Sequence, residues 1–538
     1  MIHSTGCVTI FLVRISIKSL QTIWAIIALF IAPSLSGAEP WTQFRGPRGD
    51  GHTTATNLPV EWSETKNVAW KTAIHDRGYS SPVIYGKQIW LTTATEDGKK
   101  LFGICIDKDT GKVLHDLHLF DVAKPQRITR DNTYASPTPA IEKGRVFLHF
   151  GTYGTACVDT ASGKVLWERR DLNCDHEAGA GPASSPMLFG NTMIVHVDGR
   201  DVQYIIALDT ATGKTVWKTL RSLDYTKFPV HHRKAYCMPM LVPRGDGQQL
   251  VSPAGRGLYA YDPKTGKELW HMRHRGWSVA PRPIYGHGLI FATIDRDNPE
   301  LWAIRPDGNG DITDTHIAWI EKRGMPERSS PLLVDDLLYF VNRGGIATCL
   351  EAKTGKEVWK ERLKGAYSAS PIYAKGRIYL FNETGTATLL RPGRKFEVIA
   401  TNTLAPQPLL ATPSVDGNAF IIRTGSHLYR IENGKELATP KPASGAKRFI
   451  GQWNIGKANP NAKPKFVMTI NADFTARKSH VPNATGRWEL VKGEARVVWS
   501  DGWRDILRTE NGRIRKYGFK PGTTFSDKHD NTDSAEKR

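Results

Sequence analysis

Aromatic, histidine and cationic side chains stand just before a proline that returns at regular intervals along the chain. Tyrosine and tryptophan stack on flat ligands, and arginine and lysine bind carboxylates and phosphates. If the fold brings these positions together, they form a binding surface; otherwise they only pack over a rim of the fold. The candidate residues are Tyr79, Tyr134, His176, Lys234, Tyr236, Trp277, Arg328 and Tyr367.

Motifs of catalytic or metal chemistry are missing from the sequence. It contains no HExxH helix, no GxSxG elbow and no phosphate-binding loop. Asp307, Asn309 and Asp311 alternate like the start of a calcium loop. However, Ile312 and Ala318 stand where such a loop needs a glycine and a bidentate glutamate. We therefore expect a hairpin tip here, no metal site and no catalytic residue.

The recurring proline opens an apolar segment with the composition of a β-strand, usually after a serine- or alanine-rich approach. A hairpin phrase, Asp-x-x-Thr-Gly-Lys-x-x-Trp, follows and is complete at residues 209–217 and 262–270. Its Asp can accept bonds from the turn, its Gly supplies a positive φ, and its Trp can dock between neighbouring sheets. The eight prolines are Pro82, Pro139, Pro186, Pro239, Pro283, Pro331, Pro371 and Pro413.

The spacing of these phrases predicts the fold. From Pro82 to Pro413 the mean spacing is about 47 residues, which is typical of four-stranded propeller blades. Residues 67–71, which include Trp70, precede the first copy and supply the Trp-bearing strand that the eighth copy lacks. We expect an all-β protein in which residues 39–440 form an eight-bladed β-propeller closed by an N-terminal strand. The candidate residues would then meet at one mouth of the channel.

Three cysteines follow the same register. Cys105, Cys157 and Cys349 lie two positions before the acidic residue of the hairpin phrase, where Ala207 and Ala260 stand in other copies. We expect these thiols to pack as small apolar groups. Disulfides are not expected, because equivalent positions in neighbouring blades are too far apart to bridge.

These phrases resemble the PQQ-like β-propeller repeat family. The resemblance is strongest to the secreted propellers of planctomycete-type bacteria, in the opening at 41–47 (WTQFRGP) and at 233–237, 276–283 and 367–371. The chain is also similar to the outer-membrane assembly propeller of Gram-negative bacteria, which implies a scaffold role. That relative is a lipoprotein, whereas this chain has no cysteine at the expected cleavage site for lipid attachment.

The resemblance also raises the question of a cofactor. Quinoprotein dehydrogenases of this fold hold pyrroloquinoline quinone between a Trp and a ring made by two adjacent cysteines, with Ca²⁺ ligands and an Asp base. This chain has no adjacent cysteine pair and no Cys-x-x-Cys-His haem motif. No catalytic residue is therefore carried over, and we expect no cofactor. A quinone-dependent oxidoreductase with the cofactor in the channel is the alternative.

The repeat stops near residue 440, and a different pattern begins. Short strand-like segments separated by glycines predict a small antiparallel β domain of about seven strands over 446–527, similar to a barrel. Residues 528–538 are polar and are expected to form a flexible tail. From residue 446 to the end there are 19 Lys and Arg against 10 Asp and Glu. This basic module could contact an anionic glycan, a membrane surface or a partner protein, or could simply be solvated.

Residues 1–38 have the charge, apolar core and small-residue order of a secretory signal that is cleaved. A retained membrane anchor is the alternative, but the apolar run after Lys18 is about 14 residues, shorter than the roughly 20 needed to span a bilayer. The chain is 40% hydrophobic and 23% charged, which excludes bulk disorder and a many-spanning membrane protein. We predict a monomeric, exported protein of the periplasm or exterior, without a lipid anchor and without a nucleic-acid partner. It would bind or scaffold an envelope protein or an anionic glycan and would not be an enzyme.

Overall fold

The computed structural model describes residues 39–538 except 177–179, 406, 438–444, 458, 460–461, 473, 482–484, 492, 500, 522, 524 and 526. The expected signal segment, 1–38, lies outside the described residues. Within them, the helices are three short 3-10 turns, Gly151–Tyr153, Tyr225–Lys227 and Val230–Arg233. Among the described residues, none of the helices could span a lipid bilayer.

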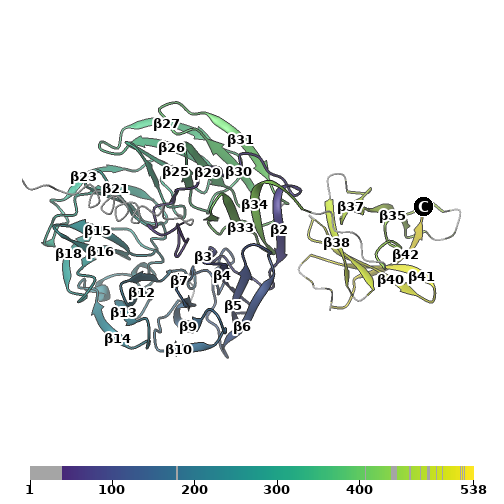
Figure 1. Cartoon of the computed structure of the whole chain (residues 1–538), viewed down its shortest axis with the longest axis horizontal. Coiled ribbons are helices and arrows are strands. Elements are labelled where there is room, and N and C mark those ends of the chain that lie inside the picture. The colour runs from purple at the N-terminus through teal and green to yellow at the C-terminus, as the bar shows by residue number, and fades with distance from the viewer. Residues whose placement is uncertain are drawn as a thin grey trace, which may run out of the picture. The chain divides into compact units, whose positions relative to one another are not determined.

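Eight four-stranded antiparallel units form a ring, which confirms the predicted eight-bladed propeller (Figure 1). Each of blades 1–7 uses four strands in chain order, from the channel outward. Blades 1–4 are β3 (Val83–Tyr85), β4 (Gln88–Ala94), β5 (Lys100–Asp107) and β6 (Val113–Asp121); β7 (Ala140–Glu142), β8 (Arg145–His149), β9 (Thr155–Asp159) and β10 (Val165–Arg169); β11 (Met187–Phe189), β12 (Thr192–Asp198), β13 (Gln203–Asp209) and β14 (Thr215–Leu220); and β15 (Met240–Arg244), β16 (Gly247–Ala254), β17 (Gly257–Tyr261) and β18 (Glu268–Arg273).

The second half of the ring repeats this order and adds two short strands, β1 (His52–Thr53) and β22 (Gly310–Asp311). The expected hairpin tip contains β22, which pairs in parallel with β18 of the preceding blade and covers part of its outer edge. Blades 5–8 are β19 (Ile284–Gly286), β20 (Leu289–Ile294), β21 (Glu300–Ile304) and β23 (Ile317–Glu321); β24 (Leu332–Val334), β25 (Leu337–Val341), β26 (Ile346–Glu351) and β27 (Glu357–Arg362); β28 (Ile372–Ala374), β29 (Arg377–Phe381), β30 (Thr386–Leu390) and β31 (Val398–Thr403); and β32 (Ser414–Asp416), β33 (Ala419–Arg423), β34 (His427–Glu436) and β2 (Lys66–Ala73).

The hairpin phrase joins neighbouring blades, as blades 2 and 3 illustrate. Asp209 Oδ1 accepts from the backbone N of Thr212 at 2.8 Å, and Gly213 has a φ of 68°. A Cβ on Gly213 would lie 2.7 Å from the Trp167 ring of the preceding blade, whose Nε1 donates to the Thr210 carbonyl at 3.0 Å. The glycine is thus required twice, for the turn and for the docked indole. The prediction that Trp docks between neighbouring sheets is confirmed.

The ring closes as predicted, with an N-terminal strand in the last blade. Strand β2 pairs antiparallel with β34, so that purple and green strands lie side by side in Figure 1. Trp70 on β2 then docks on blade 1, where its Nε1 donates to the Lys108 carbonyl at 2.9 Å and its ring covers Gly111. The two ends of the propeller sequence are therefore held in one sheet.

The N-terminal segment 41–53 runs through the centre of the ring before it reaches β2 (Figure 1). The carbonyls of Trp41 and Thr42 accept from the backbones of β3 and β7 in blades 1 and 2. The buried Arg45 donates to the Pro331 carbonyl at 2.8 Å, next to blade 6, and β1 pairs in parallel with β28 of blade 7. The chain therefore fills its own channel, a feature that the repeat pattern does not predict.

Gly51 tests how tightly this segment is packed. Its φ is 84°, and a Cβ would meet the Pro371 carbonyl and Arg45 Nη2, both at 2.8 Å. Gly376, in the turn after β28, has a φ of 74° and no neighbour within 4 Å of a Cβ. Gly376→Ala should cost about 1 kcal/mol of unfolding free energy from the backbone alone. Gly51→Ala should cost clearly more in urea denaturation; equal losses would contradict tight packing in the channel.

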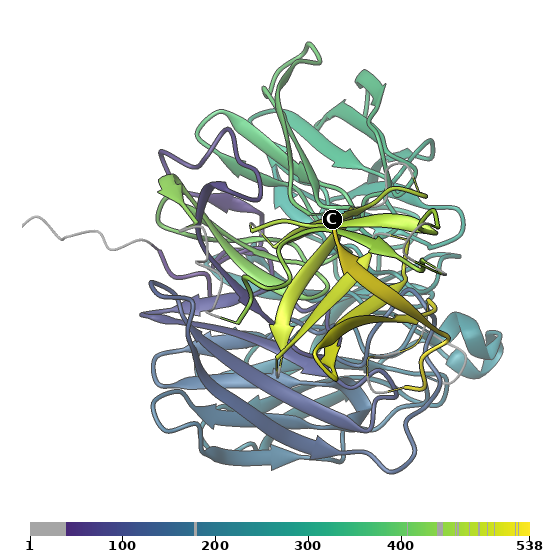
Figure 2. The same ribbon diagram turned by 90° about the vertical axis from the view of Figure 1, so that its right-hand side faces the viewer.

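The C-terminal strands form a closed antiparallel barrel, coloured yellow in Figure 2. It has eight strands, one more than expected, because residues 531–537 form β42 and pair with both β35 and β41. The expectation of a flexible tail at 528–538 is therefore wrong: backbone pairing holds a segment whose composition alone indicates disorder. The strands are β35 (Gly451–Ile455), β36 (Phe466–Ile470), β37 (Thr475–Lys478), β38 (Thr485–Val491), β39 (Glu494–Trp499), β40 (Arg504–Glu510), β41 (Arg513–Phe519) and β42 (Asn531–Lys537).

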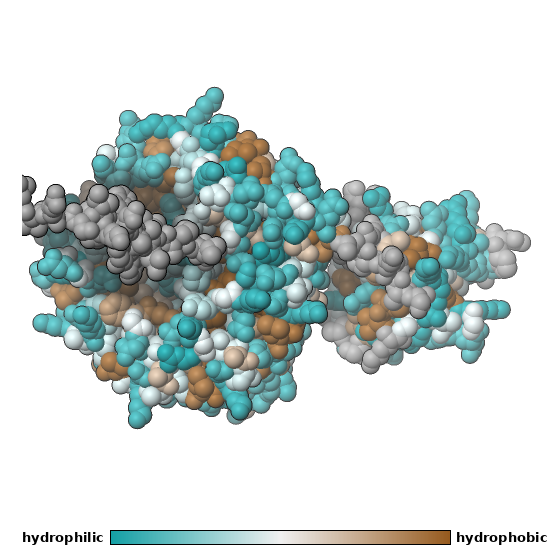
Figure 3. Space-filling model, in the orientation of Figure 1, coloured by the Kyte–Doolittle hydropathy of each residue, from teal (hydrophilic) through white to brown (hydrophobic). Residues whose placement is uncertain are grey.

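The burial of Cys105, Cys157 and Cys349 confirms the packing expected from their repeat register. The five cysteines of the described part, Cys105, Cys157, Cys174, Cys237 and Cys349, are buried and form no disulfide. On the face drawn in Figure 3, apolar patches are separated by hydrophilic residues.

Candidate ligand pocket at the channel mouth

A series of hydroxyl groups links the inner strands at the mouth and explains the serine or threonine that directly precedes most of the repeat prolines. The backbone N of Ser81 donates to Thr138 Oγ1 at 3.0 Å, and the backbone N of Thr138 donates to Ser185 Oγ at 2.9 Å. On the opposite side, the Ser330 N donates to Ser370 Oγ at 3.0 Å, and the Ser370 N donates to Thr412 Oγ1 at 2.9 Å. These bonds set the positions of neighbouring blades and of the residues before each proline.

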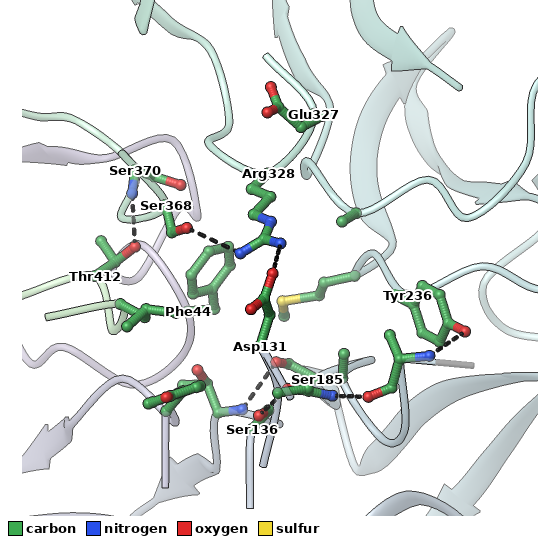
Figure 4. A pocket seen from close by; sticks show the side chains of 18 of the residues that line it. Phe44, Asp131, Ser136, Ser185, Tyr236, Glu327, Arg328, Ser368, Ser370 and Thr412 are labelled. Atoms are coloured by element: carbon green, nitrogen blue, oxygen red, sulfur yellow. Dashed lines mark hydrogen bonds and ion pairs between the residues drawn. The ribbon is translucent and has the colours of Figure 1, made fainter. Parts of the chain in front are cut away.

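A cavity of about 380 Å³ lies inside this series (Figure 4). Several of the linking hydroxyls line it, together with aromatic, aliphatic and charged side chains from most of the blades. Phe44 of the channel-filling segment and Met238 supply apolar surface. A mixed, concave lining of this kind is typical of a ligand site.

The charged groups of the pocket meet around Asp131. Arg328 Nη2 lies 2.9 Å from Asp131 Oδ2, and Arg343 Nη2 lies 3.3 Å from the same oxygen. Glu383 supports both arginines from another side, 3.4 Å from Arg343 Nε and 4.0 Å from Arg328 Nη1. Ser368 Oγ donates to Glu383 at 2.6 Å and accepts from Arg328 Nη1 at 3.5 Å. Two guanidinium groups are thus held in place at the mouth.

The electrostatics of the mouth favour anions. The hydrogen bond from Arg328 and the charges of Arg343 and Arg296 hold the pKa of Asp131 below its usual value. Arg296 is exposed and lines the pocket, and the described residues place no carboxylate within ion-pair distance of its guanidinium group. Burial and the charge of Arg200 lower the pKa of the nearby Lys234 ammonium.

Three of the eight sequence-predicted residues line this pocket, namely Tyr79, Tyr236 and Arg328. Tyr79 is half-buried, and its hydroxyl accepts from Arg77 at 3.4 Å. The buried Tyr236 hydroxyl accepts from the Ala180 backbone N at 3.2 Å. That these residues bind a ligand stays a prediction.

The other five predicted residues do not line this pocket. Tyr134 is buried beside a neighbouring depression that Arg77, Arg127 and Arg130 also line. Lys234 and Tyr367 are buried, and Trp277 packs against His231 and His232. His176 is buried at a small separate cavity. A position before the proline thus predicts a place near the mouth, but neighbouring side chains decide whether it faces the pocket.

Other residues that line the pocket have no sequence pattern that marks them. Phe44 lies in the WTQFRGP phrase, but nothing in that phrase shows that it enters the channel. Asp131 and Arg296 lie in connections between strands, and Arg343 lies in the turn after β25. Their only signal is charge in a loop, which is common on any surface.

The small cavity at His176 is a second cluster of titratable groups, with a volume of about 20 Å³. His149 and His196 also line it, and His196 Nε2 hydrogen-bonds Ser184 Oγ at 2.7 Å. His196 Nδ1 lies 3.7 Å from Asp198, whose carboxylate is instead paired with the buried Arg221 at 2.9 Å. The cavity holds little more than one water molecule, so this arrangement has no room for a substrate.

The mouth pocket does not match the expected surroundings of pyrroloquinoline quinone. Its lining contains two tyrosines and Phe44 but neither Trp nor Cys. In the described part of the chain, no group of three His, Cys, Asp or Glu side chains could hold a metal ion. Segment 41–53 also occupies the channel. We therefore derive no reaction step through this cofactor.

Solved structures with similar architecture include redox enzymes. A europium-containing methanol dehydrogenase aligns with a TM-score of 0.53 and 12% identity, covering 74% of this chain and 90% of the enzyme. The quinohemoprotein alcohol dehydrogenase of Comamonas testosteroni aligns with a TM-score of 0.51 and 10% identity, covering 76% and 82%. At such identities the similarity shows the propeller fold alone.

Sequence comparisons are more specific. The outer membrane protein assembly factor BamB of Shewanella oneidensis is 22% identical over 251 residues, which cover 43% of this chain and 57% of that protein. This chain thus matches only about half of its curated relative. The family model described as outer membrane protein assembly factor BamB matches residues 52–172, 135–245, 201–333 and 311–448. Since these matches span well over half of the chain, the protein belongs to this family of PQQ-like repeat propellers.

Proposed function

We propose that this protein is an exported, monomeric binding module of the cell envelope that captures a segment of another envelope protein at the channel mouth. The mouth pocket carries this proposal. It is concave, partly apolar and lined by arginines, and segment 41–53 occupies the channel beneath it. A filled channel leaves the mouth available for capture rather than for passage or for a deep cofactor.

Family membership supports a protein partner over a glycan. The curated relative is named an assembly factor for outer membrane proteins, and we infer a comparable envelope location here. The basic C-terminal module, with its 19 Lys and Arg against 10 Asp and Glu, would supply a second contact with an acidic partner or a membrane surface. We assign no catalytic residue.

Site-specific photo-crosslinking in cells that produce the full chain tests this function. A benzoylphenylalanine in place of Tyr79 retains an aromatic ring at a half-buried wall of the pocket. We expect one adduct of defined mass with an exported protein, identified by mass spectrometry. The matched control replaces the exposed Lys375, which follows β28 and so lies at the opposite end of an inner strand; it should give no such adduct.

Other results would overturn the proposal. Identical adducts from positions 79 and 375 would indicate non-specific crosslinking instead of binding at the pocket. Adducts with polysaccharide would favour the hypothesis of a glycan ligand. Saturable binding of pyrroloquinoline quinone with Ca²⁺, followed by absorbance and thermal shift, would favour the oxidoreductase alternative instead.

A further inference from the structure

Asp131 and Arg328 connect opposite sides of the ring. Asp131 lies in the connection from blade 1 to blade 2, and Arg328 lies in the connection from blade 5 to blade 6. Their ion pair, at 2.9 Å, therefore spans the mouth and joins positions 197 residues apart (Figure 4). The carboxylate of Asp131, a loop residue, thus lies between Arg328 and Arg343.

The two arginines do not depend on Asp131 for their positions. Glu383, whose side chain is 18% exposed, contacts both guanidinium groups, and Ser368 adds a hydrogen bond to Arg328. The Asp131 side chain is 47% exposed and belongs to a connection with exposed neighbours. An ion pair this exposed is weak, so another carboxylate can replace Asp131 at little cost while the arginines stay in place.

Three arginines line the pocket, against two carboxylates, Asp131 and Glu327. Arg328 and Arg343 share the carboxylates of Asp131 and Glu383. Among the described residues, no carboxylate lies within ion-pair distance of the Arg296 guanidinium. The backbone N of Arg343 contacts Glu327 at 3.3 Å, so this second acidic lining residue is directed to the main chain. Planar guanidinium groups bind carboxylates through paired hydrogen bonds, which an ammonium cannot reproduce.

Resting on the proposed function, we propose that Arg328, Arg343 and Arg296 bind a carboxylate of the partner protein, and that Asp131 is an internal competitor for that site. An Asp or Glu side chain of the captured segment takes the place of Asp131, and apolar side chains beside it contact Phe44 and Met238. The connection that carries Asp131 moves aside when the ligand binds.

Fluorescence anisotropy with the purified full chain tests this site. The probe is labelled hexaglutamate, with labelled hexaglutamine as the neutral control and oligogalacturonate as a carbohydrate competitor. Asp131→Asn should bind hexaglutamate up to about fivefold more tightly, because a weak competing carboxylate is gone. Arg328→Gln should bind it roughly tenfold more weakly, and Arg328→Lys should restore only part of the loss.

A matched control removes one positive charge elsewhere. Arg391 pairs with Glu397 in the hairpin before β31 and is exposed, so Arg391→Gln should leave binding unchanged. If it weakens binding as much as Arg328→Gln, the effect is general charge and the site is wrong. Thermal unfolding checks each variant, and Arg343→Gln, at a more exposed side chain, replaces Arg328→Gln if that variant unfolds.

The remaining outcomes separate this inference from the proposed function. If Asp131→Asn binds no more tightly than the parent, Asp131 is not a competitor. If no variant binds hexaglutamate while the Tyr79 crosslink to an exported protein persists, the carboxylate class is wrong but capture stands. If oligogalacturonate binds more tightly than hexaglutamate, the ligand is a glycan and both proposals fail.

Discussion

Replacing Trp70 with alanine should lower the free energy of unfolding by about 3–5 kcal/mol, the usual cost of truncating a buried tryptophan. The Trp70 side chain is buried, packs in one cluster with Ile106 and Tyr429, and donates to the Lys108 carbonyl. It also joins the first and last blades. Loss of this contact should therefore weaken the ring at its closure as well as leave a cavity.

Trp217→Ala is the matched control for this prediction. Trp217 occupies the same repeat position within the ring, is equally buried and donates to the Pro263 carbonyl at 3.2 Å. Urea denaturation should show similar losses for both variants. Hydrogen exchange should separate them: only Trp70→Ala should expose the amides of β2 and β34. Unchanged exchange there would mean that strand pairing alone closes the ring.

Acidification below pH 6 should destabilise the propeller steeply, because several histidines are buried in their neutral form. Burial lowers the pKa of His149 to about 3, and that of His176 and His274 to about 4. Burial and the charge of Arg221 also place the pKa of His196 well below the ordinary 6.5. All four side chains have little contact with solvent.

The direction of this pH effect on stability follows from proton uptake by the histidines on unfolding. In the unfolded chain these histidines bind protons below pH 6.5, whereas in the folded chain they stay neutral down to about pH 4. Stability is therefore fully present above pH 6.5 and is lost as the pH falls. Each histidine contributes a loss of about 1.4 kcal/mol for each pH unit in that window.

Unfolding free energies in urea at pH 7 and pH 5 measure this effect. His149→Asn removes one titrating ring and keeps an acceptor or donor for Thr155 Oγ1, which lies 2.8 Å from Nδ1. It should flatten the pH dependence and move the acid midpoint to lower pH. His75→Gln is the control, because contacts with Asp76 and Asp116 raise the pKa of His75. A flatter profile from His75→Gln would contradict burial as the cause.

Much of the fold could be predicted because its signals are local and repeated. The Asp, Gly and Trp of the hairpin phrase determine a turn and a docking contact within nine positions, and the proline phrase marks each inner strand. The strand that carries Trp70 lies before the first repeat and matches the strand that the eighth repeat lacks, so the closure of the ring could be predicted in the same way. The barrel was predicted less well, because β42 is polar and only its pairing with β35 and β41 shows that it is a strand.

The candidate site was predicted only in part. Tyr79, Tyr236 and Arg328 carry the right chemistry at repeat positions, and the structure places them around one pocket. Tyr367 and Lys234 have the same sequence signal and are buried instead. The direction in which each side chain points from its strand or loop decides whether it faces the pocket or is buried. That direction depends on packing against residues of other blades.

The sequence by itself determined the number of blades and the position of closure, since both depend on contacts within a repeat or between adjacent repeats. Only the tertiary structure decided that segment 41–53 fills the channel and that Asp131 meets Arg328 across it. Those contacts join residues hundreds of positions apart. They arise because a closed ring brings every inner strand to a common axis. A local sequence pattern does not show which distant residues meet there.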